Sequence, residues 1–248
     1  MTNPKERTAL VTGASRGIGR AAARALARDG ARVLVHYGRA REQAESLVAE
    51  VRAAGGRAEA VGADLEARDG AHRLAEEVRK LADGKLDILV ANAGVTKAAA
   101  IEQLTPEDFD RLFAVNVKAP FFLIQQLLPV LADGASVILV SSRSARVAFP
   151  NIAAYAATKG AVETLVKHFA AALGPRGIRV NAVAPGVVDT DMSSFTHTED
   201  GRKMVLSIQA LQRIAAPDDV SGVFAFLASD AARWITGQTI AVDGGSKL

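Results

Sequence analysis

Apolar and polar positions follow two recurring patterns along the chain. Short, nearly continuous apolar runs such as Leu86–Val90 are typical of buried strands. Longer stretches such as Ala154–Leu173 are typical of helices that bury one face. The apolar runs predict strands at residues 8–12, 32–36, 57–61, 86–90, 135–141, 178–184 and 238–242. Predicted helices separate them at residues 20–29, 40–54, 68–82, 106–131, 154–173 and 217–229.

A helix between successive strands favours parallel strands, because the chain must return along the sheet before each new strand starts. Parallel sheets are covered on both faces, so helices are expected on both sides. The pattern predicts one α/β domain over residues 1–248, without a linker, internal repeat or low-complexity tract. A polar segment at about residues 190–213 interrupts the alternation.

Composition narrows the class of protein. The 248 residues are 49% hydrophobic, which is enough for one packed core. Cys is absent, which excludes disulfides and a Cys nucleophile, and no His, Asp or Glu group has the spacing of metal ligands. The net charge is only +3, the basic residues are dispersed and aromatic residues make up 5%, so nucleic acid is not an expected partner. The polar start and the lack of a bilayer-length apolar run predict a cytoplasmic protein with no membrane partner.

A glycine-rich loop follows the first predicted strand, with the spacing Gly13-x-x-x-Gly17-x-Gly19. Glycines at this point let the backbone turn tightly and approach a pyrophosphate. The helix that follows offers free N–H groups and a positive dipole end to the anion. The loop therefore predicts a dinucleotide site, although such a loop is also found as a plain tight turn.

The end of the second predicted strand indicates which dinucleotide is bound. An acidic residue there would bind the 2′-OH of NAD, but the sequence reads His36-Tyr37-Gly38-Arg39. Arg16, inside the glycine loop, and Arg39 would both suit a 2′-phosphate. We therefore favour NADP(H) over NAD(H); the alternative is that both arginines are ordinary surface residues.

Tyr155 and Lys159 are four residues apart on a predicted helix and so share one face. A neighbouring ammonium favours the phenolate and is expected to lower a tyrosine pKa from about 10. A tyrosine with a lowered pKa can exchange protons near neutral pH. The pair alone is weak evidence, because Tyr and Lys meet at this spacing on many solvated helices.

Taken together with Asn92-Ala-Gly94, Ser142 and Pro185-Gly186, these motifs resemble the short-chain dehydrogenase/reductase family over nearly the whole chain. The resemblance implies a Rossmann-type, doubly wound parallel sheet of about seven strands in one NAD(P)-binding domain. It implies an NADP(H)-dependent oxidoreductase that reduces a small-molecule carbonyl to a secondary alcohol, reversibly. It also implies a homotetramer formed through the region 234–245, which otherwise reads as an edge strand.

The resemblance further implies a catalytic tetrad of Asn116, Ser142, Tyr155 and Lys159. Tyr155 would act as general acid and base on the carbonyl oxygen, and Ser142 would hydrogen-bond the same oxygen. Lys159 would lower the Tyr155 pKa and bind the nicotinamide ribose, while Asn116 would place a water that links Lys159 to solvent. Alternatively, Ser142 caps a turn and Asn116 bonds to backbone.

The cofactor contacts implied by the resemblance follow the ends of several strands. They are Gly13, Ser15, Arg16, Gly17, Ile18, Gly19, Tyr37, Arg39, Asp64, Leu65, Asn92, Ala93, Gly94, Tyr155, Lys159, Pro185, Gly186, Val188 and Thr190. Asp64 would accept from the adenine amine, or else cap the following helix. Residues 190–213 match the mobile substrate lid of the family, with Met192 and Phe195 as apolar contacts and Phe149 and Ile152 as a further apolar wall.

Two alternatives to a general carbonyl reductase stay open. One is 3-oxoacyl-carrier-protein reductase of fatty-acid synthesis, for which Arg176 matches a basic docking position but residues 131–134 do not. The other is a dinucleotide-binding regulator without turnover, although Tyr155 and Lys159 are both present. Arg143 faces either the substrate or the surface, and His197 is expected to be solvated and not catalytic.

Overall fold

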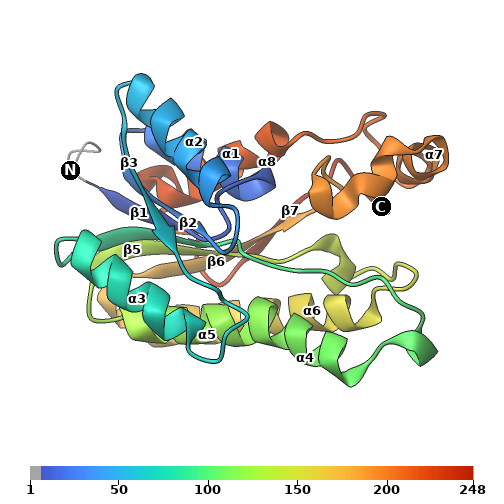
Figure 1. Ribbon diagram of the computed structural model, residues 1–248, viewed down its shortest axis with the longest axis horizontal. Coiled ribbons are helices and arrows are strands. Elements are labelled where there is room, and N and C mark those ends of the chain that lie inside the picture. The colour runs from blue at the N-terminus through green and yellow to red at the C-terminus, as the bar shows by residue number, and fades with distance from the viewer. Residues whose placement is uncertain (1–6, 248) are drawn as a thin grey trace.

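Seven parallel strands form one sheet through the middle of the molecule (Figure 1). The computed structural model describes residues 7–247; the polar start, residues 1–6, lies outside this range. The strands are β1 (Thr8–Val11), β2 (Arg32–Tyr37), β3 (Arg57–Gly62), β4 (Leu86–Ala91), β5 (Leu131–Val140), β6 (Arg179–Pro185) and β7 (Thr239–Val242). Their order is β3-β2-β1-β4-β5-β6-β7, and adjacent strands pair in parallel. The predicted α/β class and doubly wound sheet are confirmed.

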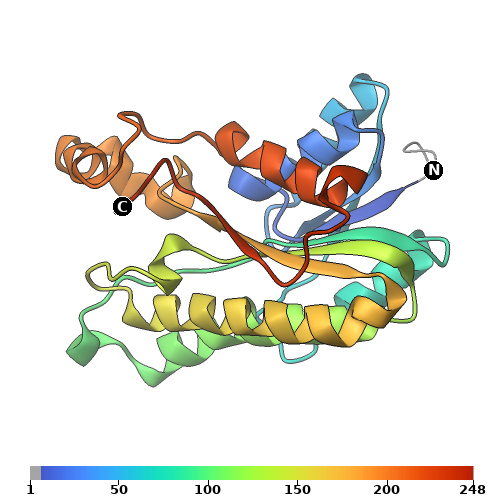
Figure 2. The same ribbon diagram turned by 180° about the vertical axis from the view of Figure 1, so that it is seen from behind.

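Helices cover both faces of this sheet (Figures 1 and 2). One face carries α1 (Gly17–Arg28), α2 (Arg41–Ala53) and α8 (Pro217–Ala228), and the other carries α3 (Gly70–Leu81), α5 (Ala119–Leu127) and α6 (Ala153–Leu173). Successive strand residues point to opposite faces. Thus Val11 and Val33 belong to the first core, whereas Leu10 and Leu34 belong to the second.

The single long helix predicted at 106–131 is wrong. It is divided into α4 (Pro106–Phe113), a π-helical turn η3 (Ala114–Lys118) and α5, and β5 begins at Leu131, earlier than predicted. Pro120 has no N–H and would clash with the carbonyl one turn earlier in a regular helix. The wider π turn, closed by the Ala119 N–H bond to the Ala114 carbonyl oxygen, avoids this conflict.

The polar segment after β6 has structure that the sequence did not predict. It contains the 3₁₀ turn η6 (Asp191–His197) and the helix α7 (Glu199–Ser207). Thr198 caps α7 by accepting a hydrogen bond from the Gly201 N–H at 3.1 Å. Shorter 3₁₀ turns are η2 (Ile101–Gln103), η4 (Arg143–Ala145), η5 (Gly174–Arg176) and η7 (Asp230–Ala232). Among residues 7–247, no helix is long and apolar enough to cross a membrane.

Candidate active site

The glycine loop after β1 is a tight turn closed by the end of β4. Gly13 and Gly17 have φ angles of +62° and +55°, which glycine adopts without steric cost. The Asn92 side-chain amide donates to the carbonyl oxygens of Thr12 at 2.8 Å and Gly13 at 3.2 Å. A Cβ at Gly19 would lie 2.3 Å from the Gly13 carbonyl oxygen. The loop is therefore built around glycine, and the start of α1 keeps the N–H groups that suit a phosphate.

His36 holds this loop from β2, a role that the sequence did not reveal. Its ring is buried, and Nδ1 accepts a hydrogen bond from the Gly13 N–H at 3.1 Å. Nε2 lies 3.0 Å from the Ala63 carbonyl oxygen, which can only accept, so Nε2 carries the proton. Burial lowers the pKa of His36 to about 4. A neutral imidazole thus joins the glycine loop to the segment after β3; the only signal in the sequence is a polar ring in an apolar strand.

Ser142, Tyr155 and Lys159 are brought together where β5 ends beside α6. Ser142 lies close enough to Tyr155 for its hydroxyl to act on the pKa of the phenol. Ser142 Oγ also accepts from Ser144, at 3.2 Å from the backbone N and 3.0 Å from Oγ. Lys159 is buried, donates to the Val140 carbonyl oxygen at 2.9 Å, and lies 5.5 Å from the centroid of the Tyr155 ring. The predicted acid Tyr155, Ser142 and the Lys159 ammonium therefore form one cluster.

The predicted decrease in the Tyr155 pKa is wrong in this structure. Burial raises the pKa of Tyr155 to about 12, and the hydrogen bond with Ser142 opposes that increase. Burial also lowers the pKa of Lys159 to about 8. Each change has the same cause, because an enclosed site disfavours both phenolate and ammonium. Tyr155 is held as the neutral phenol, the form that can donate a proton.

Asn116 lies in the π turn, and its side-chain amide hydrogen-bonds to the backbone of Val95. Its Oδ1 accepts from the Val95 N–H at 2.9 Å, and its Nδ2 donates to the Val95 carbonyl oxygen at 2.9 Å and to Thr158 Oγ1 at 3.1 Å. A Cβ at Gly94 would lie 3.3 Å from Asn116 Oδ1 and 3.6 Å from Lys159 Nζ. The structure thus places Asn116 near Lys159, while the water relay stays a prediction.

The two arginines predicted to bind a 2′-phosphate are exposed and contact carboxylates. Arg16 lies 2.9 Å from Asp191, and Arg39 lies 3.5 Å from Glu66 and 4.0 Å from Asp64. The alternative that Asp64 caps the next helix is wrong, because its Oδ1 instead accepts from the Glu66 N–H at 2.9 Å. Convergence of the two arginines stays a prediction.

The segment after β6 passes over the glycine loop. A Cβ at Gly17 would lie 3.2 Å from the Thr190 side chain, and Val188 is buried and pairs with Ala215. Gly186 donates its N–H to the Val242 carbonyl oxygen at 3.1 Å. The other predicted cofactor positions lie at the ends of β2 and β6, in the segments after β1, β3 and β4, and in α1: Ser15, Ile18, Tyr37, Leu65, Ala93 and Pro185.

Two basic residues, Arg143 and Arg176, form ion pairs within the fold. Arg143 points neither at open solvent nor along the surface: its Nε lies 2.6 Å from Asp243 Oδ2. Arg176 lies 2.8 Å from Asp133 and donates to the carbonyl oxygens of Leu128 and Leu131. The basic position expected to dock an acyl carrier protein therefore fixes the turn before β5.

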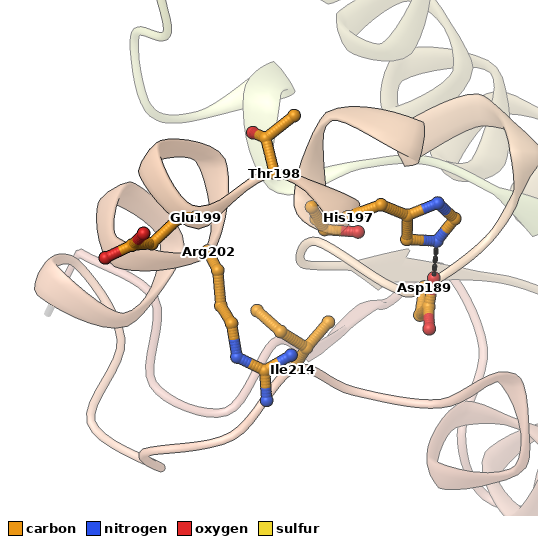
Figure 3. Close-up of a pocket in the computed structure, with 7 residues that line it drawn as sticks. Asp189, His197, Thr198, Glu199, Arg202 and Ile214 are labelled. Atoms are coloured by element: carbon orange, nitrogen blue, oxygen red, sulfur yellow. Dashed lines mark hydrogen bonds and ion pairs between the residues drawn. The ribbon is translucent and has the colours of Figure 1, made fainter.

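A pocket of about 330 Å³ opens in the lid region (Figure 3). His197 points towards Asp189 there, with Nε2 2.8 Å from Oδ1. His197 is exposed as expected, but it has this partner. The lining residues are Asp189, Thr196, His197, Thr198, Glu199, Arg202 and Ile214. None belongs to the predicted tetrad. Within residues 7–247, no group of His, Asp and Glu could hold a metal ion.

Comparison with known proteins agrees with this geometry. A family model described as enoyl-(acyl carrier protein) reductase matches residues 13–247. Versicolorin reductase of Emericella nidulans is 40% identical over 97% of this chain and 95% of its own length. The crystal structure of angucycline C-6 ketoreductase LanV with bound NADP superposes with a TM-score of 0.95 at 43% identity, covering 99% of this chain and 97% of LanV. A LanV structure with NADP and rabelomycin gives a TM-score of 0.90 at 43% identity, covering 98% and 96%.

A doubly wound sheet with a glycine loop after its first strand and a Ser, Tyr and Lys cluster at the end of β5 defines a nucleotide-dependent oxidoreductase. The chain belongs to the short-chain dehydrogenase/reductase family. The matching family model spans residues 13–247, and the relatives cover nearly the whole chain.

Proposed function

We propose that this protein is an NADP(H)-dependent oxidoreductase that reduces a ketone to a secondary alcohol and catalyses the reverse oxidation, acting on CH–OH donors. The observation that carries the proposal is the grouping of Ser142, Tyr155 and the buried Lys159 where β5 ends beside α6. This cluster lies at the sheet edge where the glycine loop also lies. We therefore assign proton transfer and dinucleotide binding to one site.

The residues present fit a dinucleotide. The turn at Gly13 and Gly17 needs positive φ angles, and Gly19 packs where no side chain fits. We assign the pyrophosphate to this loop and the start of α1. The 2′-phosphate is assigned to Arg16 and Arg39, because no acidic residue ends β2. Solved relatives crystallised with NADP support this choice of cofactor.

Further cofactor contacts are proposed at the same edge of the sheet. Asp64 and Leu65 would contact the adenine, and the ribose side would be lined by Asn92, Ala93 and Gly94. The nicotinamide side is assigned to Pro185, Gly186, Val188 and Thr190, of which Thr190 lies against Gly17 of the glycine loop.

The cofactor, when bound, supplies or accepts a hydride; the protein supplies proton transfer and orientation. The neutral Tyr155 phenol donates its proton to the carbonyl oxygen, and Ser142 donates a hydrogen bond to the same oxygen as negative charge develops. The Lys159 ammonium stabilises the phenolate that remains. Asn116 holds the water through which Tyr155 is reprotonated.

We propose a polycyclic aromatic ketone as the substrate. The relatives include versicolorin reductase and the angucycline C-6 ketoreductase LanV, which was crystallised with rabelomycin. The lid also has exposed apolar side chains at Met192, Phe195 and Met204, which suit a flat apolar molecule. An acyl-carrier-protein substrate has less support, because Arg176 is engaged with Asp133.

We propose that the protein functions as one domain with a lid at 190–213, and as a homotetramer. The β7 side of the sheet supports the assembly, because Trp234 is 96% exposed and Phe226 on the neighbouring α8 is 40% exposed. In an oligomer, both side chains would be buried against a neighbouring subunit.

The test is NADPH oxidation measured against polycyclic ketones, simple ketones, β-ketoesters and acyl thioesters. The wild-type protein is expected to reduce the polycyclic ketones with NADPH. Tyr155→Phe is expected to lose this activity while its NADPH affinity is unchanged. Wild-type turnover by Tyr155→Phe would show that another group donates the proton. Tight NADPH binding without turnover on any substrate would favour a regulator.

A further inference from the structure

Arg143 lies directly after the proposed catalytic Ser142, yet its side chain turns away towards the other end of the chain. Its Nε lies 2.6 Å from Asp243 Oδ2, and its Nη2 donates to the Ser246 carbonyl oxygen at 3.0 Å. The Arg143 and Asp243 side chains are only 18% and 12% exposed. The pair is therefore largely removed from water, where losing one partner is costly.

Asp243 is itself held against the segment after β6. A Cβ at Gly186 would lie 2.9 Å from Asp243 Cα, and Asp243 Oδ1 accepts from the Gly245 N–H at 3.0 Å. Gly186 belongs to the proposed nicotinamide side of the site. The ion pair thus joins the turn that carries Ser142 to the segment that carries Gly186.

The segment Asp243–Lys247, which we call the clasp, also hydrogen-bonds to residues 208–211, the base of the lid. The carbonyl oxygens of Gly245 and Gly244 accept from the N–H groups of Ala210 at 3.1 Å and Leu211 at 2.9 Å. Ser246 pairs with Gln209 in an antiparallel bridge. The chain just after α7 is therefore bonded to the clasp by its backbone.

A second contact joins the clasp to the loop of residues 143–149, which follows Ser142. Lys247 Nζ donates to the Ala148 carbonyl oxygen at 2.6 Å and lies 4.4 Å from the centroid of the Phe149 ring. The clasp is thus bonded on one side to residues 208–211 and on the other to residues 143–149.

We propose that Arg143 is a positioning residue that acts through Asp243: the pair fixes the Ser142 turn to the clasp and, through the clasp, to the base of the lid. The inference rests on the proposed function for the role of Ser142. Loss of the Arg143 guanidinium removes one anchor of this turn, in which Ser142 Oγ accepts the two hydrogen bonds from Ser144. It also leaves the Asp243 carboxylate poorly solvated, so the clasp moves and the lid base loosens.

The matched control lies on the same loop. Arg146 is 2.8 Å from Glu163 of α6 and has no contact with the clasp among the described residues. Arg143→Ala and Arg146→Ala each remove one loop arginine from an ion pair. They differ in which part of the molecule loses its partner.

Hydrogen exchange of the Ala210 and Leu211 amides is the first measurement, and it does not depend on turnover. Protection in the free enzyme is expected to fall about 10-fold or more in Arg143→Ala and in Asp243→Asn, and to stay unchanged in Arg146→Ala. Unchanged protection in Arg143→Ala, or an equal fall in Arg146→Ala, overturns the proposal. If coupling is seen while the wild type reduces no ketone, the clasp stands and the proposed function fails.

Kinetics supply the second measurement. Arg143→Ala should lower kcat for ketone reduction by about 10- to 100-fold with the NADPH dissociation constant within twofold, because a misplaced hydroxyl harms the reaction and not cofactor binding. Arg143→Lys, which keeps one charged donor, should recover part of kcat. The double variant with Asp243→Asn should be no worse than Arg143→Ala alone, since both act through one pair. Additive losses would show that the two residues act separately and would overturn the inference.

Discussion

The Nδ1 atom of His36 accepts a hydrogen bond from the backbone N–H of Gly13 at 3.1 Å. On its other side, the same ring donates from Nε2 to the Ala63 carbonyl oxygen at 3.0 Å. The imidazole can make both bonds only as the neutral Nε2–H tautomer, because a protonated Nδ1 would meet the N–H of Gly13. The shape of the glycine loop is thereby linked to the protonation state of one buried ring.

We predict that His36 makes the protein less stable as the pH falls from about 6.5 to about 4. Its pKa is about 4 when folded and about 6.5 when unfolded, so between these values the unfolded chain binds the extra proton. The stabilisation of the protein that comes from the neutral ring is fully present above pH 6.5. It is lost as the pH falls towards 4, and the total loss is at most about 3 kcal/mol. Urea unfolding between pH 7 and pH 4 measures it.

Asn at position 36 provides the control, because its Oδ1 can take the place of Nδ1 as the acceptor for the Gly13 N–H but the side chain does not titrate in this range. Carboxylates contribute equally to both proteins, so the difference between the two curves isolates the imidazole. The His36→Asn curve should be flatter between pH 6.5 and pH 4.5. Parallel curves would mean that the ring is not responsible for the acid lability.

We predict that Gly19→Ala disrupts the glycine loop. The added Cβ would lie 2.3 Å from the Gly13 carbonyl oxygen and 2.4 Å from Asn92 Nδ2, and a backbone carbonyl cannot move aside cheaply. A loss of about 1–3 kcal/mol of unfolding free energy and at least tenfold weaker NADPH binding are expected. Gly222→Ala in α8 has no atom within 4 Å of its new Cβ and should be neutral or slightly stabilising. Equal effects of the two substitutions would contradict the steric explanation.

The sheet could be predicted from the sequence because its pattern is local. Apolar runs separated by helices define a parallel sheet whichever order the strands take, and Gly30, which follows α1, marked its end. The break of the predicted helix 106–131 was not predictable from periodicity, since Pro120 is tolerated near a helix start. The helix α7 was missed because its stretch of sequence is mostly polar.

The candidate site divides in the same way. Tyr155 and Lys159 were found through their spacing within the chain, and Ser142 through the resemblance to the family. The contacts of His36 with Ala63 and of Arg143 with Ser246 join residues 27 and 103 positions apart, and a single sequence carries no signal for such pairs. The direction of the Tyr155 pKa shift was missed because it depends on burial, which spacing does not give.

We predict that ketone reduction loses kcat/KM above about pH 8. Burial lowers the pKa of Lys159 to about 8, so its stabilising charge is present below that pH and lost above it. Tyr155, with a pKa of about 12, stays protonated throughout this range and contributes no limb. Because kcat/KM reports the free enzyme, its pH profile should be level below pH 8 and fall tenfold per pH unit well above it.

Lys159→Arg tests the assignment of this limb, since guanidinium stays charged at every accessible pH. The variant is expected to have lower activity but a level profile from pH 7 to pH 10. The same decline near pH 8 in both proteins would assign the limb to another group.

The cofactor preference gives the last prediction. Arg39 is 81% exposed, and its contacts with Glu66 at 3.5 Å and Asp64 at 4.0 Å are exposed ion pairs worth about 0–1 kcal/mol. Such a guanidinium can exchange these carboxylates for a phosphate dianion at little cost. Arg39→Ala is therefore expected to raise the NADPH dissociation constant about tenfold and to leave that of NADH within twofold.

Arg41, which is 73% exposed and 3.7 Å from Glu45, provides the matched control. Titration by cofactor fluorescence should find Arg41→Ala unchanged for both nucleotides. Equal dissociation constants for NADH and NADPH in the wild type would refute the preference, and an Arg39→Ala, Arg16→Ala double variant with unchanged NADPH affinity would refute the assignment to these two residues.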